Sequence, residues 1–302
     1  MRKYDNPVSH IPVLANEILN FFEPRDGSNY VDCTVGEGGH AELILAQNGP
    51  SGMLLGIDRD RAILDKAEKN LERFNKRVIL IRDTYANLSE IISIYNFKSI
   101  YGILFDLGIS SYHVEDAGGG FSFSKDEPLD MRFDRESSEE TAGDILKKWS
   151  EEQLEWLFST YGEDNYAKVL AQEIVRIREK YPLRTTNDLV EVVRRVKKHS
   201  DKKINPATQI FQALRIVVNH ELEELEDALP QAVNELIPGG RLAVISYHSL
   251  EDRLVKHFLL KKQHEAQIKI LTDKPIVPSL IEQKENPRSR SAKLRLAEKL
   301  YR

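Results

Sequence analysis

The sequence contains a single cysteine, Cys33, and no long run of apolar residues. One thiol cannot form an internal disulfide, and it excludes a zinc site built from several cysteines. No stretch approaches the roughly 18 consecutive apolar residues that a membrane-spanning helix needs. The basic residues Arg2 and Lys3 are not followed by the apolar segment of a secretory signal. We therefore expect a cytoplasmic protein that does not insert into a membrane.

Neither sign of charge is in large excess, because 43 Lys and Arg face 48 Asp and Glu, for a net charge of -5. This balance argues against a nucleic-acid binder that works by bulk attraction. The charges are segregated, however: residues 176–203 hold ten Lys and Arg against four acids, and residues 284–302 hold seven against two. The first segment is typical of a solvated helix face. The second favours contacts to phosphate.

Short apolar segments alternate with helical patterns in the first third of the 302-residue chain. The expected strands are residues 30–35, 53–57, 78–81 and 100–105, and the expected helices are residues 41–47, 61–74 and 88–94. A fifth strand is expected at residues 241–245. Such alternation predicts right-handed βαβ crossovers, and so an α/β fold in which helices cover both faces of a parallel sheet.

The 133 residues between Asp106 and Gly240 far exceed the roughly 30 that a crossover needs. They begin with a long loop rich in Gly, Ser and Asp, of the kind retained for function, and continue with helical patterns. We therefore expect an inserted, mainly helical domain at residues 111–207 between two parts of one sheet domain, at residues 1–110 and 208–302. The second part is expected to start with a helix that returns the chain to the sheet.

A glycine-rich loop follows the first expected strand and contains Gly36, Gly38, Gly39 and His40. Its spacing loosely fits a dinucleotide-binding fingerprint, which nicotinamide enzymes also show. Asp58 ends the second strand, where a carboxylate can accept both hydroxyls of an adenosine ribose. Asp32 lies beside the loop, where it would repel a pyrophosphate and attract an amino group. Asp32 therefore favours S-adenosylmethionine as the ligand, although a helix cap at Asp58 or Asp60 and a simple tight turn are the plainer alternatives.

Asp106 ends the fourth strand and is the catalytic candidate. In a doubly wound sheet this position faces the bound ligand. If the reaction is base methylation, the exocyclic amine is a poor nucleophile, because its lone pair is delocalised into the ring. The enzyme must then supply an acceptor for the N–H and hold the reactants in line. Asp106 could be that acceptor, with a nearby backbone carbonyl oxygen or a purely structural strand end as alternatives.

Longer motifs resemble a known family. They are residues 10–14, 32–40, 106–111, 120–123, 128–132, 211–216, 246–253 and 286–295. Through them the chain resembles, from about residue 10 to 298, the bacterial small-subunit ribosomal RNA cytidine-N4 methyltransferases, the MraW or RsmH family. The resemblance implies a Rossmann-like class I methyltransferase that uses S-adenosylmethionine. It also implies that the substrate is one cytidine in the decoding region of 16S ribosomal RNA, free or in the small subunit.

The resemblance assigns donor contacts to Gly38, Gly39, His40, Asp58 and Asp106, beside Gly36 and Asp32 from the loop argument. Two further positions depart from the family pattern. Tyr85 stands where a Phe near the adenine is expected and keeps the aromatic ring. His113 stands where a Gln is usual, so its donor contact is the less supported of the two.

Two kinds of RNA contact are expected, because an enzyme that modifies a base edge must take that base out of its stack. Phe121, Phe123 and Tyr247 are candidates for stacking on the base, with local core packing as an equal alternative. The basic residues expected to contact the RNA are Arg253, Arg288, Arg290 and Lys293, with Arg295 in the same serine-interleaved motif.

No metal site is predicted, because the eight histidines include no pair spaced as in a zinc-binding helix motif. Two rival functions stay open. A nicotinamide oxidoreductase fits the loose glycine fingerprint but not Asp32, and a non-catalytic RNA-binding or assembly factor fits the basic segments but leaves Asp106 unexplained. A homodimer is also open, since the acid-rich residues 134–155 and 221–227 could pair with basic segments of a second copy.

Overall fold

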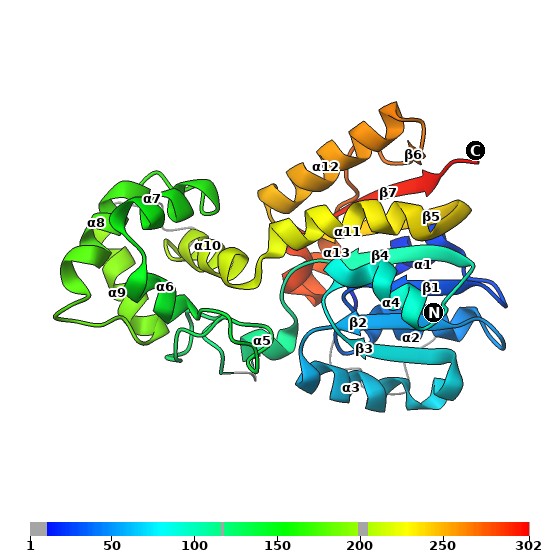
Figure 1. Ribbon diagram of the computed structural model, residues 1–302, viewed down its shortest axis with the longest axis horizontal. Coiled ribbons are helices and arrows are strands. Elements are labelled where there is room, and N and C mark those ends of the chain that lie inside the picture. Colours follow the sequence, from blue (N-terminus) through cyan, green and yellow to red (C-terminus); the bar gives the residue numbers. More distant parts are fainter. Residues whose placement is uncertain (1–10, 116–117, 199–204, 302) are drawn as a thin grey trace. The chain divides into compact units, whose positions relative to one another are not determined.

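The computed structural model describes residues 11–115, 118–198 and 205–301 (Figure 1). These residues form two compact units. The first combines the chain up to Gly108 with the chain from Leu222 onward, and the second is Ile109–Glu221. The predicted fold class, an α/β sheet with a mainly helical insertion, is confirmed. Among the described residues no helix combines the length and the apolar character needed to cross a membrane.

The first unit is built on a seven-stranded sheet of order β3-β2-β1-β4-β5-β7-β6. The parallel strands are β1 Asn29–Asp32, β2 Leu54–Asp58, β3 Val78–Arg82, β4 Ile100–Asp106 and β5 Leu236–Ser246. Strand β7 (Lys293–Lys299) runs antiparallel between β5 and β6 (Ile268–Ile270). The chain changes direction across the sheet between β1 and β4. Ligands of doubly wound sheets bind at the carboxyl ends of the strands at such a point.

Helices cover both faces of this sheet, as Figure 1 shows. They are α1 Ala15–Phe22, α2 Gly39–Gln47, α3 Arg61–Leu71, α4 Leu88–Ile94, α11 Glu221–Glu235, α12 Ser249–His264 and α13 Leu280–Glu285. One apolar core joins the sheet to α4, α11 and α12, and another joins it to α1, α2 and α3. Successive strand residues such as Tyr30 and Val31 enter opposite cores, because side chains alternate along a strand. Both faces are therefore apolar, which explains the continuous apolar runs in the sequence.

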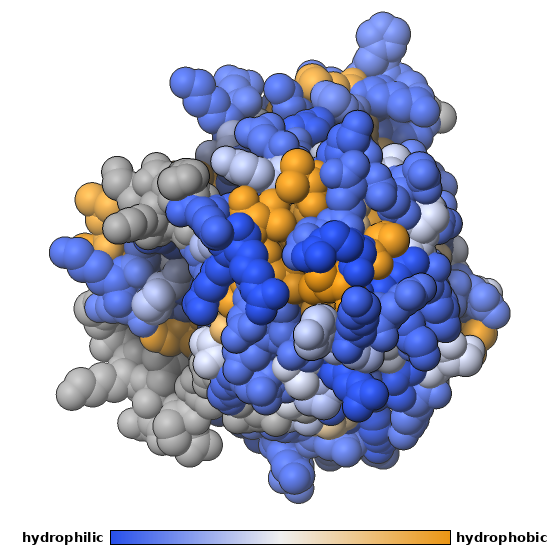
Figure 2. Space-filling model, turned by 90° about the vertical axis from the view of Figure 1, so that its left-hand side faces the viewer, coloured by the Kyte–Doolittle hydropathy of each residue, from blue (hydrophilic) through white to orange (hydrophobic). Residues whose placement is uncertain are grey.

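The second unit is helical. Its helices are α5 Ser111–Glu115, α6 Ala142–Lys148, α7 Glu151–Thr160, α8 Ala167–Ile177, α9 Thr186–Val196 and α10 Thr208–Asn219. Capping boxes at Thr141, Ser150 and Thr185 begin α6, α7 and α9, because each side chain accepts from the backbone N–H three residues on. The unit also exposes a few large hydrophobic side chains, including Trp156 and Val169. Figure 2 shows apolar residues gathered on one face of the molecule within a largely hydrophilic surround.

The expected single returning helix at residues 208–236 is divided in the structure. Helix α10 ends at Asn219, and His220 adopts a left-handed conformation with φ of 52°. The apolar side chains of α10, among them Ile210 and Leu214, pack in the core of the helical unit. The expected boundary at residue 207 therefore falls too early. The second part of the sheet unit begins at Leu222 and not at residue 208.

Candidate active site

The glycine loop between β1 and α2 takes a backbone path that side chains would obstruct. Gly36 and Gly38 have φ of 54° and 91°, in the left-handed region that glycine adopts without strain. A Cβ atom on Gly39 would lie 2.8 Å from Cγ of Pro12. The glycines are therefore required for this turn, as the simpler interpretation of the sequence stated. The turn lies at the carboxyl end of β1, where ligands of doubly wound sheets bind.

Asp58 holds this loop in place at the end of β2. Its Oδ2 accepts a hydrogen bond from the Gly36 backbone N–H at 3.1 Å, and its Oδ1 accepts one from Asp60 N–H at 3.0 Å. The cap of α3 is Asp60, which accepts from Ala62 N–H at 2.8 Å. The helix-cap alternative is therefore confirmed for Asp60 and not for Asp58. The Asp58 carboxylate instead lies fixed beside the glycine loop.

Asp32, at the end of β1, is only 1% exposed. Burial raises the pKa of this carboxyl to about 7, although the charge of His40 and the backbone N–H of Thr34 act in the opposite direction. The Thr34 N–H donates to Asp32 Oδ1 at 3.2 Å. Asp32 is therefore a buried acid that changes its charge near neutral pH. Its nearby charged neighbours include Asp58 and Asp106.

His40 lies in the first turn of α2 with its ring buried. Its Nε2 is 3.5 Å from Asp106 Oδ2, which is ion-pair range but long for a hydrogen bond. Burial opposes the imidazolium, but the Asp106 and Asp32 carboxylates outweigh it and raise the pKa of His40. Neither ring nitrogen has a hydrogen-bond partner among the described residues. Buried polar atoms are normally satisfied, so these two nitrogens point to a ligand.

Asp106, at the end of β4, is fixed by two hydrogen bonds. Its backbone N–H donates to Thr34 Oγ1 at 2.7 Å, and its Oδ1 accepts from the Tyr247 hydroxyl at 2.7 Å. Thr34 comes shortly after β1 and Tyr247 directly after β5, so the chain at the ends of both strands helps to hold Asp106. Burial, together with the nearby Asp106 charge, raises the pKa of Tyr247 well above its usual value. The phenol therefore keeps its proton and acts as a donor to Asp106.

Tyr85 lies in a short 3-10 helix, η2 (Tyr85–Asn87), that follows β3. Its ring packs edge-on against Phe105 at a centroid distance of 5.6 Å. The helix is capped by Thr84, whose hydroxyl donates to Glu224 Oε2 on α11 at 2.8 Å. The segment that carries Tyr85 is thus tied to α11.

His113 belongs to the other unit and not to this cluster. It is buried there against the rings of Phe121 and Phe133, each with its centroid 5.0 Å away. Its Nδ1 lies 3.1 Å from Ser110 Oγ. The structure thus gives His113 a packing role, and the donor contact stays a prediction.

The aromatic candidates for base stacking are engaged in local packing. Phe121 is 8% exposed and stacks on Phe133 at 5.5 Å, while Phe123 packs edge-on against Phe211 at 5.7 Å. Both belong to the core of the helical unit or pack against it. The core-packing alternative is therefore the one that the structure displays. Base stacking by Phe121, Phe123 or Tyr247 stays a prediction.

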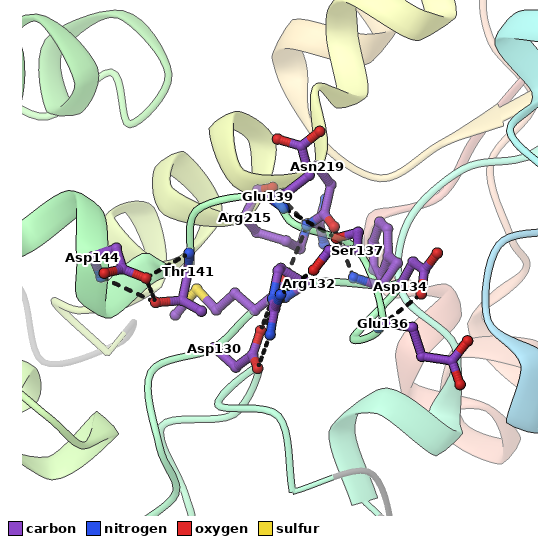
Figure 3. A network of polar contacts seen from close by, with 12 residues as sticks. Asp130, Arg132, Asp134, Glu136, Ser137, Glu139, Thr141, Asp144, Arg215 and Asn219 are labelled. Carbon is purple, nitrogen blue, oxygen red and sulfur yellow. Dashed lines mark hydrogen bonds and ion pairs between the residues drawn. The ribbon is translucent and has the colours of Figure 1, made fainter.

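The motif at residues 128–132 organises the long loop of the helical unit, as Figure 3 shows. Arg132 donates hydrogen bonds to both carboxylate oxygens of Asp130, at 2.7 and 3.0 Å, and to the Ser137 carbonyl oxygen at 2.7 Å. Asn219 on α10 donates to the Met131 carbonyl oxygen at 2.7 Å and accepts from Phe133 N–H at 2.8 Å. These contacts fasten the loop to the end of α10. The residues therefore have a structural explanation within this unit.

The basic motif near the C-terminus divides into engaged and exposed residues. Lys293 and Arg295 lie in β7 and both contact Asp252 on α12, at 3.3 and 2.7 Å. Arg295 is only 7% exposed. Arg290 and Arg253 are exposed, and Arg288 is partly buried. Phosphate contacts by Arg253, Arg288, Arg290 and Lys293 all stay predictions.

Sequence reasoning missed the hydroxyl of Thr34 as a partner of Asp106, and it missed the hydrogen bond from Tyr247. Tyr247 and Asp106 are 141 residues apart in the chain. Only the register of the sheet brings them together, since β4 and β5 are paired up to Asp106 and Ile245. The available signal in the sequence was that Asp106 and Tyr247 each lie at the end of an expected strand.

Comparison with known proteins decides the family. Residues 7–300 match the model of the MraW methylase family. The chain belongs to the MraW methylase family. Among its relatives, the ribosomal RNA small subunit methyltransferase H of Thermomicrobium roseum is 44% identical and covers 98% of this chain and 96% of its own length. The protein of the same name from Thermosipho melanesiensis is also 44% identical, over 99% of this chain and 100% of its own.

Membership of the MraW methylase family confirms the resemblance that the sequence motifs carried, and it makes the chain a methyltransferase. The match spans both the sheet and the helical insertion. The cluster of Asp32, His40 and Asp106 beside the glycine loop is therefore the candidate active site of a methylase of this family.

Proposed function

We propose that this member of the MraW methylase family transfers a methyl group from S-adenosylmethionine to N4 of one cytidine in the decoding region of 16S ribosomal RNA, in the cytoplasm. The observation that supports the proposal most is the cluster of the buried Asp32 and His40 with the partly exposed Asp106 at the carboxyl ends of β1 and β4. Near-full-length relatives are named for methylation of small-subunit ribosomal RNA.

The residues around the glycine loop fit the methyl donor. S-adenosylmethionine supplies an electrophilic methyl group on a sulfonium. Asp58 presents a fixed carboxylate for the ribose hydroxyls, and the aromatic ring of Tyr85 suits the adenine. Asp32 offers its buried carboxylate to the amino group. The two ring nitrogens of His40, which lack a hydrogen-bond partner among the described residues, offer polar contacts. A pyrophosphate beside Asp32 and Asp106 would be repelled, which opposes the nicotinamide alternative.

Asp106 is the residue that we assign to the acceptor amine. Its Oδ1 is held by Tyr247, while its Oδ2 lies toward His40. A carboxylate oxygen that accepts a hydrogen bond from N4–H increases the electron density on N4 and holds the amine in line for attack on the methyl group. The same carboxylate can take the proton that N4 loses when the new N–C bond forms. A nearby backbone carbonyl oxygen remains the alternative acceptor.

The direct test measures transfer of labelled methyl from S-adenosylmethionine to small ribosomal subunits that lack cytidine-N4 methylation, followed by nucleoside analysis. We expect labelled N4-methylcytidine with the wild-type protein and a loss of at least about a hundredfold in rate with Asp106→Ala. Asp26→Ala is the matched control, because Asp26 accepts hydrogen bonds from Ser51 in the loops before β1 and β2 and is not part of the Asp32, His40 and Asp106 cluster. Tight donor binding without transfer would move the assignment to another substrate or to an assembly factor.

The finer points of the proposal have simple checks. We infer that transfer needs no metal, so a chelator should leave the rate unchanged. Titration of the protein with NADH and with S-adenosylmethionine distinguishes the methyltransferase from the oxidoreductase alternative, since only S-adenosylmethionine should bind. A homodimer stays a prediction, which sedimentation at several protein concentrations can test.

A further inference from the structure

Tyr247 is held more firmly than a side chain that only fills space beside the site. Its hydroxyl donates to Asp106 Oδ1 at 2.7 Å, and its backbone N–H donates to Glu251 Oε2 at 2.8 Å. Its ring lies against Gly108, where an added Cβ would be 3.0 Å from ring atom Cδ2. Gly108 also has φ of 112°, which disfavours a side chain there. Backbone, ring and hydroxyl are thus all positioned.

The contact to Asp106 is the feature that matters for the reaction. A carboxylate at a strand end can rotate about its two side-chain bonds, so its backbone hydrogen bond to Thr34 does not aim its oxygens. The Tyr247 hydroxyl makes a short, charge-assisted hydrogen bond to one oxygen. The other oxygen, Oδ2, is 3.5 Å from His40 Nε2. Fixing Oδ1 therefore fixes the direction in which Oδ2 points.

The phenol is suited to this task across the neutral pH range. Burial, the Asp106 charge, and the charges of Glu251 and Glu282 raise the pKa of Tyr247 well above its usual value. The hydroxyl therefore remains a donor. Around Asp106 the other titratable groups are His40 and Asp32, and the pKa values of both lie above their usual ranges.

We propose that Tyr247 is a positioning residue that orients the Asp106 carboxylate toward the amine to be methylated. The inference rests on the role given to Asp106 under the proposed function. In this role Tyr247 affects the reaction through Asp106, and the role does not depend on contact between the Tyr247 ring and the base.

The test is Tyr247→Phe, which keeps the ring against Gly108 and removes only the hydroxyl. We expect kcat to fall about tenfold to a hundredfold, because a misdirected acceptor loses in-line placement. The KM and Kd for the donor should stay within about twofold, since the other donor-binding residues are untouched. The pH–rate profile should also change, because the hydroxyl that donates to Asp106 Oδ1 is removed.

Two further variants separate positioning from packing. Tyr30→Phe is the matched control, because it removes another buried tyrosine hydroxyl, one that donates to the Phe22 carbonyl oxygen at 3.3 Å. It should leave kcat and the pH profile unchanged. Tyr247→4-aminophenylalanine restores an N–H donor at the same place and should recover part of kcat. It also carries the test if Tyr247→Phe fails to fold.

The proposal is overturned if Tyr247→Phe keeps the wild-type kcat and pH profile, or if its loss is not recovered by 4-aminophenylalanine. It is also overturned if Tyr30→Phe shows the same loss. Failure of the proposed function would look different, because the wild-type protein would then give no N4-methylcytidine. If the wild-type protein methylated another atom, the ratio of wild-type to variant kcat would still measure the effect of Tyr247.

Discussion

At the scale of single residues, Asp32 combines deep burial with a titration near neutral pH. Its environment raises the pKa of the carboxyl to about 7, so the free protein holds it mostly protonated at pH 6 and mostly ionised at pH 8. A cationic amino group of the donor binds the ionised form better. Binding below pH 7 should therefore release a proton from Asp32, by the linkage between protonation and affinity.

This argument predicts that donor affinity rises with pH. We expect the Kd for S-adenosylmethionine to be roughly threefold to tenfold lower at pH 8 than at pH 6. The raised pKa of His40 acts in the same direction, because His40 loses its positive charge as the pH rises. Asp32→Asn should therefore weaken the pH dependence without removing it. Isothermal titration calorimetry in buffers of different ionisation enthalpy measures both affinity and proton release, and an unchanged slope in Asp32→Asn would contradict the assignment.

At the scale of elements, a buried ion pair joins Lys197, directly after α9, to Asp164, shortly before α8. Lys197 Nζ contacts Asp164 Oδ2, and it also donates to the Pro206 carbonyl oxygen at 2.8 Å. Both side chains are almost fully buried. Removal of one partner leaves an uncompensated charge in the interior, which costs far more than the pair itself contributes.

We therefore predict that Lys197→Met lowers the free energy of unfolding of the helical unit by about 3 to 5 kcal/mol. The double variant Lys197→Met with Asp164→Leu should recover most of that loss, because no buried charge remains. Urea unfolding followed by circular dichroism gives the comparison. Arg195→Met is the control, since Arg195 pairs with Glu191 on the exposed face of α9 and should change stability by less than about 1 kcal/mol.

The elements also show what could be predicted from sequence. Strands β1 to β5 were predictable because each contains a short run of apolar residues, as burial on both faces requires. Strand β7 was not, because its leucines alternate with Lys293 and Arg295 and the motif suggested a solvated phosphate site. The structure buries Arg295 by pairing it with Asp252. A distant carboxylate thus converts a basic segment into an inner strand.

The division between α10 and α11 was hidden for a related reason. A left-handed residue such as His220 is uncommon outside glycine and asparagine, so the sequence carries no strong stop signal there. At the site, the acids at strand ends were predictable from the fold. The contacts between them were not, because Asp106 and Tyr247 meet only through strand register.

At the scale of the whole molecule, the net charge of -5 requires that RNA contacts come from local groups of basic residues. Arg290 is one candidate that remains exposed in the sheet unit. Its segment follows α13, which is tied to the chain before α1: Glu282 Oε1 accepts from Leu14 N–H at 2.7 Å, and Asn286 donates to the Ile11 carbonyl oxygen at 2.9 Å. Residues 11–14 include Pro12, which packs against the glycine loop. Arg290 therefore belongs to a segment that is linked to the glycine loop through residues 11–14.

We predict that Arg290→Glu weakens binding of small-subunit RNA and lowers the slope of log Kd against log salt by about one, while donor affinity stays the same. Each lost phosphate contact releases one fewer condensed counterion, and this is why the slope reports the number of contacts. Arg25→Glu makes the same change of charge at an exposed position in the loop before β1 and should leave the slope unchanged. Filter binding at four salt concentrations distinguishes the two outcomes. Equal slopes for wild type and Arg290→Glu would show that the exposed arginine does not contact phosphate, and would leave RNA recognition to other basic residues.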